Sequence, residues 1–175
     1  MEQHLIPALD LVGERYEKQQ IFLPQLMNAA AASGAAFDEV RKAIEAEGGQ
    51  GEGKGPVLLA TVEGDIHDIG KNIAKCILEN YGFHVIDLGR DVPPETVAEA
   101  AAKHNVKLVG LSALMTTTLP SMAKTIALVH EKCPGTKVYG AGAVLTPEYA
   151  AEIGADYYAK DAKQGVDIAK EVLAN

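Results

Sequence analysis

The chain has 175 residues, a formal net charge of −8 and a pI near 5.1, and 47% of its residues are hydrophobic. This length suits one well-buried domain with a small appendage. The acidic balance argues against nucleic-acid binding, which needs a basic face to neutralise phosphates. No apolar run is long enough to span a membrane, the N-terminus has no signal-peptide pattern, and the two cysteines have no metal-ligand spacing, so we expect a cytoplasmic protein.

Apolar residues at helical spacing predict a small all-α unit at the start of the chain. The spacing from Leu5 to Tyr16 predicts one helix, a second begins near Phe22 and runs through the alanines, and a third covers about 37–44. Glycines mixed with charged residues at 49–55 predict a linker. This helical unit is too short to form a good core alone.

After the linker, the sequence alternates between strand and helix patterns. The expected strands are 56–62, 84–89, 107–113, 136–142 and 155–159, and the helices between and after them begin near Gly70, Pro93, Leu119, Pro147 and Ala162. Five strands alternating with five helices predict an α/β fold, a flavodoxin-like, doubly wound parallel sheet of the Rossmann-like type. We place the helical unit at 1–48, the linker at 49–55 and the α/β domain at 56–175.

Ligands of such sheets bind outside the carboxyl ends of the strands, where the first expected strand is followed by GDIHDIGKN. This loop superficially matches a phosphate-binding loop, which needs two glycines separated by four residues and then Lys-Ser/Thr. Here Gly64 and Gly70 are separated by five residues, and Asn72 stands where a hydroxyl is required. Asp65 and Asp68 would also repel phosphate, so nucleotide binding is disfavoured.

His67 in this loop has two interpretations. A lone loop histidine often has no role, but Asp65 stands two residues before it at the end of a strand. An imidazole whose second nitrogen donates to a carboxylate is a well-oriented metal ligand. A zinc site needs three or four protein ligands, and none lies at ligand spacing. A single histidine suffices only if a macrocycle fills the other positions around the metal.

Three motifs in order resemble the cobalamin-binding domain of methionine synthase and of corrinoid methyl-carrier proteins. DIHDIG at 65–70 is similar to that family's Asp-x-His-x-x-Gly, and SAL at 112–114 is similar to its Ser-x-Leu. Ala141 and Gly142 stand where the family usually has Gly-Gly. The stretch VGERYEKQQIFLPQLMNAA resembles the helical cap before this domain, so the unit at 1–48 is interpreted as part of a cap that is usually a four-helix bundle.

The resemblance implies a cobalamin cofactor, as methylcobalamin, whose nucleotide tail leaves the cobalt and enters a slot in the sheet domain. His67 would be the axial ligand to cobalt, Asp65 would bond its other ring nitrogen, and Thr118 would support that carboxylate; these three are the expected catalytic residues. Tyr16 and Leu23 would cover the methyl-bearing face. The other implied cofactor-binding residues are Gly64, Ile66, Asp68, Gly70, Ser112, Leu114, Thr116, Gly142 and Ala162.

The function implied is that of a methyl carrier, which shuttles a methyl group between methyltransferase active sites and is not a complete enzyme. The stretch GKNIAKCILENYGFHVIDLGRDVPPE favours the methionine-synthase type. Corrinoid proteins of methanol, methylamine or aryl-ether systems, a cobalamin-dependent mutase domain and a B12 sensor stay open as alternatives. The expected partners are methyl-donor and methyl-acceptor methyltransferase domains or subunits and a reductive activation partner, with no nucleic acid and no membrane.

Overall fold

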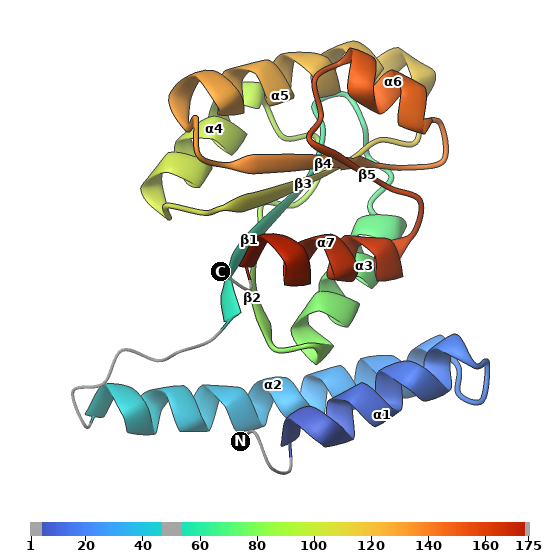
Figure 1. Ribbon diagram of the computed structural model, residues 1–175, viewed down its shortest axis with the longest axis vertical. Helices are drawn as coiled ribbons and strands as arrows, with labels where there is room; N and C mark the ends of the chain where they lie inside the picture. Colours follow the sequence, from blue (N-terminus) through green and yellow to red (C-terminus); the bar gives the residue numbers. More distant parts are fainter. Residues whose placement is uncertain (1–4, 47–53, 174–175) are drawn as a thin grey trace.

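The computed structural model describes residues 5–46 and 54–173, which form a pair of helices beside an α/β sheet domain (Figure 1). Helix α1 spans Leu5–Glu17 and helix α2 spans Leu23–Ala46. The sequence predicted two separate helices in this region, one from near Phe22 and one at about 37–44, but α2 runs through both without a break. Its alanine-rich run favours helix, and Gly34 in its middle causes no break. The predicted linker lies mostly outside the described residues, and its last two residues already belong to the first strand.

Five strands form one sheet in the order β2-β1-β3-β4-β5, and every neighbouring pair is parallel. The strands are β1 (Lys54–Thr61), β2 (Phe83–Asp87), β3 (Leu108–Ser112), β4 (Lys137–Ala141) and β5 (Tyr157–Ala159). The helices that connect and follow them are α3 (Ile69–Asn80), α4 (Pro94–Lys103), α5 (Leu119–Lys132), α6 (Pro147–Glu152) and α7 (Ala162–Leu173). This confirms the predicted doubly wound sheet. A short 3-10 helix, η1 (Thr116–Thr118), was not predicted.

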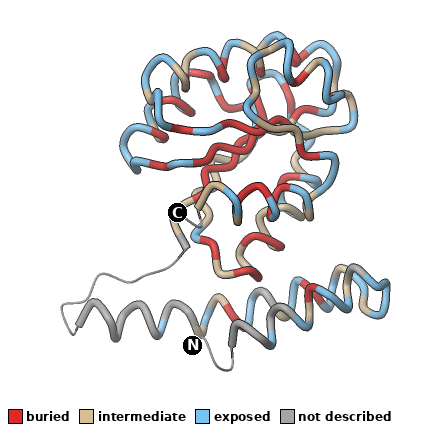
Figure 2. The backbone as a smooth tube through the Cα atoms, in the orientation of Figure 1, coloured by how far each residue is buried: buried red, intermediate tan, exposed pale blue. Residues whose placement is uncertain are grey.

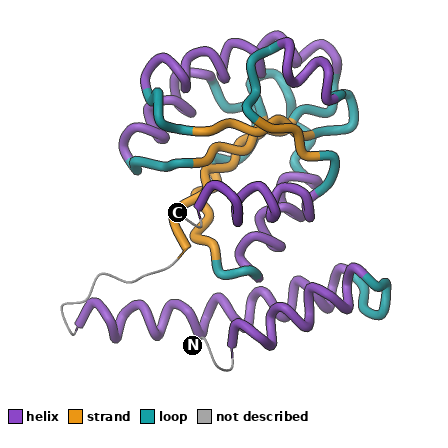
Figure 3. Tube along the Cα trace, viewed as in Figure 1, coloured by secondary structure: helices purple, strands orange, loops and turns teal. Residues whose placement is uncertain are grey.

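Helices cover both faces of the sheet and enclose two clusters of buried apolar side chains (Figures 1 and 3). Helices α4, α5 and α6 pack on one face, and α3 and α7 pack on the other. Strand β1 supplies both clusters, because successive strand side chains point to opposite faces. Figure 2 shows this buried core along the central strands. Leu26 of α2 joins the cluster under α3 and α7, so the helical pair packs on that face.

The strand order creates a switch point between β1 and β3. Helix α3 follows β1 on one face of the sheet, and α5 follows β3 on the other. The loops after β1 and β3 therefore diverge and leave a crevice at the carboxyl edge, where ligands of such sheets bind. Among the helices in the described ranges, none combines the length and apolarity needed to cross a membrane.

Candidate functional site

The buried carboxylate of Asp65 joins the loop after β1 to the loop after β3. Its Oδ1 accepts hydrogen bonds from the backbone N–H of His67 at 3.0 Å and from its ring Nδ1 at 2.8 Å. Its Oδ2 accepts from the backbone N–H groups of Leu114 (2.7 Å) and Met115 (3.1 Å), and from the Thr118 hydroxyl (3.0 Å). The structure thus brings Asp65 and Thr118 into contact, as the resemblance implied, although 53 positions separate them.

These hydrogen bonds keep the Asp65 carboxyl ionised. Burial alone raises its pKa, but the hydrogen bonds from His67, Leu114 and Met115 outweigh burial and hold the pKa well below its usual range. An ionised carboxylate only accepts hydrogen bonds, so the shared proton lies on Nδ1 of His67. In the neutral imidazole, the other ring nitrogen, Nε2, then carries the free lone pair that a metal ligand needs.

His67 presents this free nitrogen at the opening of a cavity. Its side chain is 45% exposed, and no residue in the described part of the chain hydrogen-bonds Nε2. The loop around it is fixed by Asp91, whose carboxylate accepts from the N–H of Gly64 at 2.7 Å. Gly64 has a φ of +84°, a conformation that glycine adopts without strain. The ring is thus oriented by Asp65 while its Nε2 edge stays accessible.

The cavity beside His67 has a volume of about 750 Å³ and lies between the strand ends, α3 and the start of α7. That volume falls within the range of small-molecule and cofactor sites. Of the predicted cofactor-binding residues, it is lined by Ile66, His67, Asp68, Gly70, Ser112, Leu114, Gly142 and Ala162. Gly142 has a φ of +131°, and a Cβ there would collide with the carbonyl oxygen of Ala113. Only glycine lets these two loops approach so closely.

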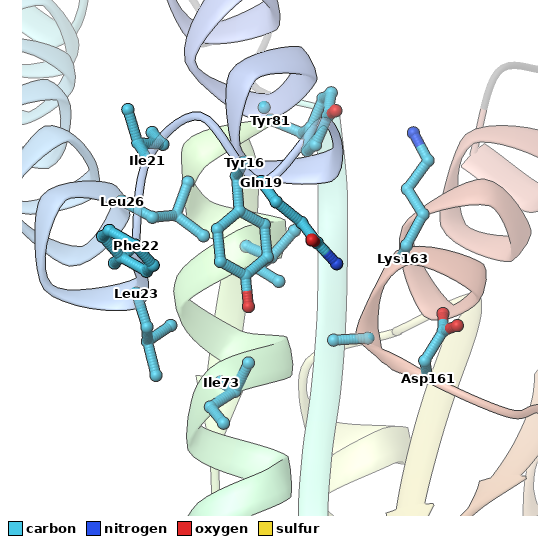
Figure 4. A pocket seen from close by; sticks show the side chains of 13 residues that line it. Tyr16, Gln19, Ile21, Phe22, Leu23, Leu26, Ile73, Tyr81, Asp161 and Lys163 are labelled. Carbon is cyan, nitrogen blue, oxygen red and sulfur yellow. The ribbon is translucent and has the colours of Figure 1, made fainter.

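Six predicted site residues do not line this cavity, and Asp65, which bonds the ring of His67, is one of them. Gly64 and Thr118 support the Asp65 loop and do not line the cavity. Thr116, in η1, is also not among the residues that line it. Tyr16 and Leu23 line a second cavity of about 780 Å³, between the helical pair and helices α3 and α7 (Figure 4). The structure therefore does not bring these last two side chains to His67.

Several lining residues were missed by the sequence reasoning, above all Leu59, Gly110 and Tyr139. The register pairs Gly110 with both of the others, and Ser112 with Ala141 two positions further along the strands. Side chains two residues apart on a strand share a face. This alternation was the available signal: it extends the predicted site inward from Ser112 to Gly110. Lys71, Arg90, Lys160 and Asp161 are charged lining residues that were also missed.

The donor set fits a metal that arrives inside an organic ligand. Within the described residues, no group of three or more His, Cys, Asp or Glu side chains could hold a metal ion. His67 offers one oriented nitrogen beside a cavity of cofactor size. The fold and the site therefore define a doubly wound α/β protein with one oriented histidine at the opening of a cavity of cofactor size.

Comparisons with known proteins identify that class more closely. A family model described as "B12 binding domain" matches residues 55–167, and a second model of the same description matches residues 1–41. The chain is 43% identical to dimethylamine corrinoid protein 1 of Methanosarcina acetivorans, over 99% of this chain and 82% of that protein. It is 44% identical to dimethylamine corrinoid protein 3 of Methanosarcina mazei, over 93% of this chain and 98% of that protein.

A solved structure agrees with these relatives. The methanol:cobalamin methyltransferase complex MtaBC from Methanosarcina barkeri matches with a TM-score of 0.88 and 30% identity, over 99% of this chain and 66% of that chain. The chain belongs to the B12-binding corrinoid proteins, and its cofactor is cobalamin. The favoured methionine-synthase type finds no support here. The alternative, a corrinoid protein of a methylamine or methanol system, fits better.

Proposed function

We propose that this chain is the corrinoid methyl carrier of a methylamine methyltransferase system. The observation that carries this proposal is the Asp65–His67 pair at the opening of the cavity, with Nε2 of the imidazole left for cobalt. The 43–44% identity to dimethylamine corrinoid proteins supports dimethylamine as the methyl source. The bound cofactor's cobalt supplies the atom that carries the methyl group.

The chain's own residues bind and orient in this proposal. Asp65 holds the imidazole of His67 in the tautomer that leaves Nε2 unprotonated, and it thereby raises the basicity of the ligand. Leu114, Met115 and Thr118 hold the carboxylate in place. The cavity behind the ring receives the nucleotide tail.

The outer side of the site is open, which suits a carrier. Around His67, the side chains of Ile66, Ile69 and Leu114 are large, apolar and exposed. An apolar rim around one polar ligand suits contact with a macrocycle, and its exposure leaves room for a partner catalyst. We propose a methyltransferase subunit as this partner, and a separate protein for reductive activation. Methanol is the second candidate source, because the MtaBC structure matches nearly the whole chain.

Cofactor binding tests the first part of the proposal. Purified protein mixed with hydroxocobalamin should retain about one cobalt per chain through gel filtration, with a spectrum in which histidine replaces the benzimidazole. The His67→Ala variant should lose that nitrogen ligand but keep much of the affinity, because the buried tail supplies most of the contact area. A parent spectrum with benzimidazole still on cobalt would contradict the proposed site.

Methyl transfer tests the second part. The loaded carrier, first reduced chemically with titanium(III) citrate, should be nearly inert toward dimethylamine, and addition of a dimethylamine:corrinoid methyltransferase should methylate it rapidly. The carrier loaded with methylcobalamin should be nearly inert toward thiols. The same assay with methanol and a methanol:corrinoid methyltransferase compares the two candidate methyl sources by the rate at which each methylates the carrier. The His67→Ala protein serves as the control for ligand-dependent transfer. Rapid methyl exchange by the isolated parent would show a complete enzyme instead of a carrier.

A further inference from the structure

Tyr139 is a buried phenol for which the described part of the chain provides no hydrogen-bond partner. The residue is 3% exposed, and burial is the one cause of the raised pKa of its hydroxyl. It lies on β4, and its ring crosses β3 at Gly110, where an added Cβ would collide with the ring and the hydroxyl. On the other side, a Cβ at Gly165 of α7 would lie 3.4 Å from the hydroxyl oxygen. Two glycines thus make room for this side chain.

Tyr139 lies at the inner part of the same cavity that His67 opens. Both residues line it, as do Gly110 and Gly165. Tyr139 pairs with Gly110, two residues toward the amino end from the pair of Ser112 and Ala141. A strand rises about 3.3 Å per residue, so the pair of Gly110 and Tyr139 lies roughly 7 Å deeper in the sheet than the pair of Ser112 and Ala141 at the strand ends.

A hydroxyl in this place favours a ligand that bonds it. The hydroxyl has no protein partner in the described residues and lines the cavity, so a ligand atom that accepts from it gains a hydrogen bond that an apolar atom there does not. Burial raises the pKa of the Tyr139 phenol well above its usual range, so the group stays protonated and can donate. The walls around it are otherwise mainly apolar or glycine, for example Leu59, Gly110 and Ala159. A single donor in an apolar wall discriminates between ligands of equal size.

We propose that Tyr139 is a specificity-determining residue for the lower base of the corrinoid, favouring a base that carries a hydrogen-bonding atom at its buried end. This inference rests on the proposed corrinoid site, because it assumes that the tail entering beside His67 ends near Tyr139. The preference concerns the chemistry of the base and is independent of the methyl source.

A matched pair of ligands isolates this hydrogen bond. Two cobamides that differ only in a 5-hydroxy or a 5-methyl group on the benzimidazole have bases of nearly equal size. Equilibrium titration, followed by the absorbance change on histidine ligation, measures both dissociation constants without any turnover. We expect the parent to bind the 5-hydroxy form about tenfold more tightly, which is the worth of one hydrogen bond. The Tyr139→Phe variant should bind the two forms equally.

Tyr157→Phe is the matched control. Its hydroxyl donates to Glu171, and the residue does not line the cavity, so the parent's preference should persist. Tyr139→Phe should also leave the unfolding temperature nearly unchanged, because the hydroxyl makes no protein hydrogen bond in the described residues that the variant would lose. Equal affinities in the parent, or a preference that survives in Tyr139→Phe, would overturn this inference and leave the proposed function standing. Failure of both cobamides to replace their base with histidine would overturn the proposed function itself.

Discussion

At the scale of single residues, the orientation of His67 depends on a loop far away in the sequence. Asp65 contacts the ring directly, but three of the donors that fix its carboxylate belong to Leu114, Met115 and Thr118. The orientation of a ligating histidine depends on the group that bonds its second ring nitrogen, and so on how firmly that group is itself held. The loop after β3 therefore controls an imidazole in the loop after β1.

The Asp65→Asn variant tests this control. An amide nitrogen cannot accept hydrogen bonds, so donors that now meet Oδ2 lose their acceptor. We expect the free energy of unfolding of the apoprotein to fall by about 2–4 kcal/mol, as for a few unpaired buried donors. Histidine ligation should weaken by about 10–100-fold. Denaturant unfolding and corrinoid titration measure the two effects.

Thr118→Val is the milder comparison for Asp65→Asn. It removes one of the donors to Asp65 and leaves the charge on the carboxylate. We expect smaller losses in both measurements. If the two variants behaved alike, the charge on Asp65 would have no part in orienting His67.

At the scale of elements, two close contacts fix the parts of the sheet edge that carry the site. The ammonium of Lys71, in the first turn of α3, is 2% exposed and lies 2.6 Å from the carboxylate of Asp87 at the end of β2. Gly89 also donates to that carboxylate, at 2.9 Å. On the other side of the site, Gly142 meets the carbonyl of Ala113. The first contact ties α3 to β2, and the second ties the loops after β3 and β4.

The ion pair predicts a defined pH dependence of stability. Burial raises the pKa of Asp87, but the hydrogen bonds from Lys71 and Gly89 outweigh burial and lower it. A lowered pKa in the folded state stabilises the fold above the unfolded value of about 3.9, and this stabilisation is lost as pH falls through the lowered value. Asp87→Asn should therefore cost about 2–3 kcal/mol at pH 7, because Lys71 stays buried without its partner charge.

The difference between parent and Asp87→Asn should be constant from about pH 5 to 7 and should shrink below about pH 4. Denaturant unfolding at several pH values measures it. The exposed pair of Glu95 and Lys124 provides the control, and Glu95→Gln should change stability little. A difference between parent and Asp87→Asn that did not vary with pH would show that the charge of Asp87 is not what stabilises α3.

Gly142→Ala tests the contact between the loops. The backbone at this position lies outside the range of ordinary L-residues, and the added Cβ would meet backbone that cannot rotate away. We expect a loss of more than about 2 kcal/mol in the free energy of unfolding and weaker cofactor binding. The same substitution at Gly34, in helix α2, meets nothing within 4 Å and should leave stability equal or slightly higher. Equal effects of both substitutions would contradict the close approach.

At the scale of the whole molecule, the helical pair lies on the face covered by α3 and α7 (Figures 1 and 4). Gly13 of α1 lies against the hydroxyl of Tyr81 at the end of α3, where a side chain would collide. The second cavity lies beneath this contact and shares only Asp161 and Ala162 with the cavity of His67. In this arrangement, Tyr16 packs between helices and does not cover the cofactor site.

Tyr16→Ala distinguishes this arrangement from the cap expected by resemblance. With the helical pair placed as described, the rate at which light cleaves bound methylcobalamin should equal that of the parent. The free energy of unfolding should fall by about 1–2 kcal/mol, because a half-buried ring is lost from the second cavity. Faster photolysis in the variant would show that the helical pair moves over the cofactor when it binds.

The sequence by itself determined the order of strands and helices and the chemistry of one loop. Apolar alternation and glycine or proline at the turns are local signals, so the sheet domain was predicted within a few residues at most boundaries. Asp65 and His67 are two residues apart, and their contact needs only one tight loop. Their proposed roles came from a resemblance of motifs, and the comparisons support that family.

Only the tertiary structure decided which distant residues meet. Periodicity tells which face a side chain takes, but it does not tell which strand becomes its neighbour. The order β2-β1-β3-β4-β5 brings Tyr139 across Gly110 and makes it part of the cavity, whereas alternation along β4 indicates only the face that Tyr139 takes. The position of Tyr16 likewise depends on where the helical pair packs, because an amphipathic helix specifies an apolar face and leaves the choice of partner to the whole fold.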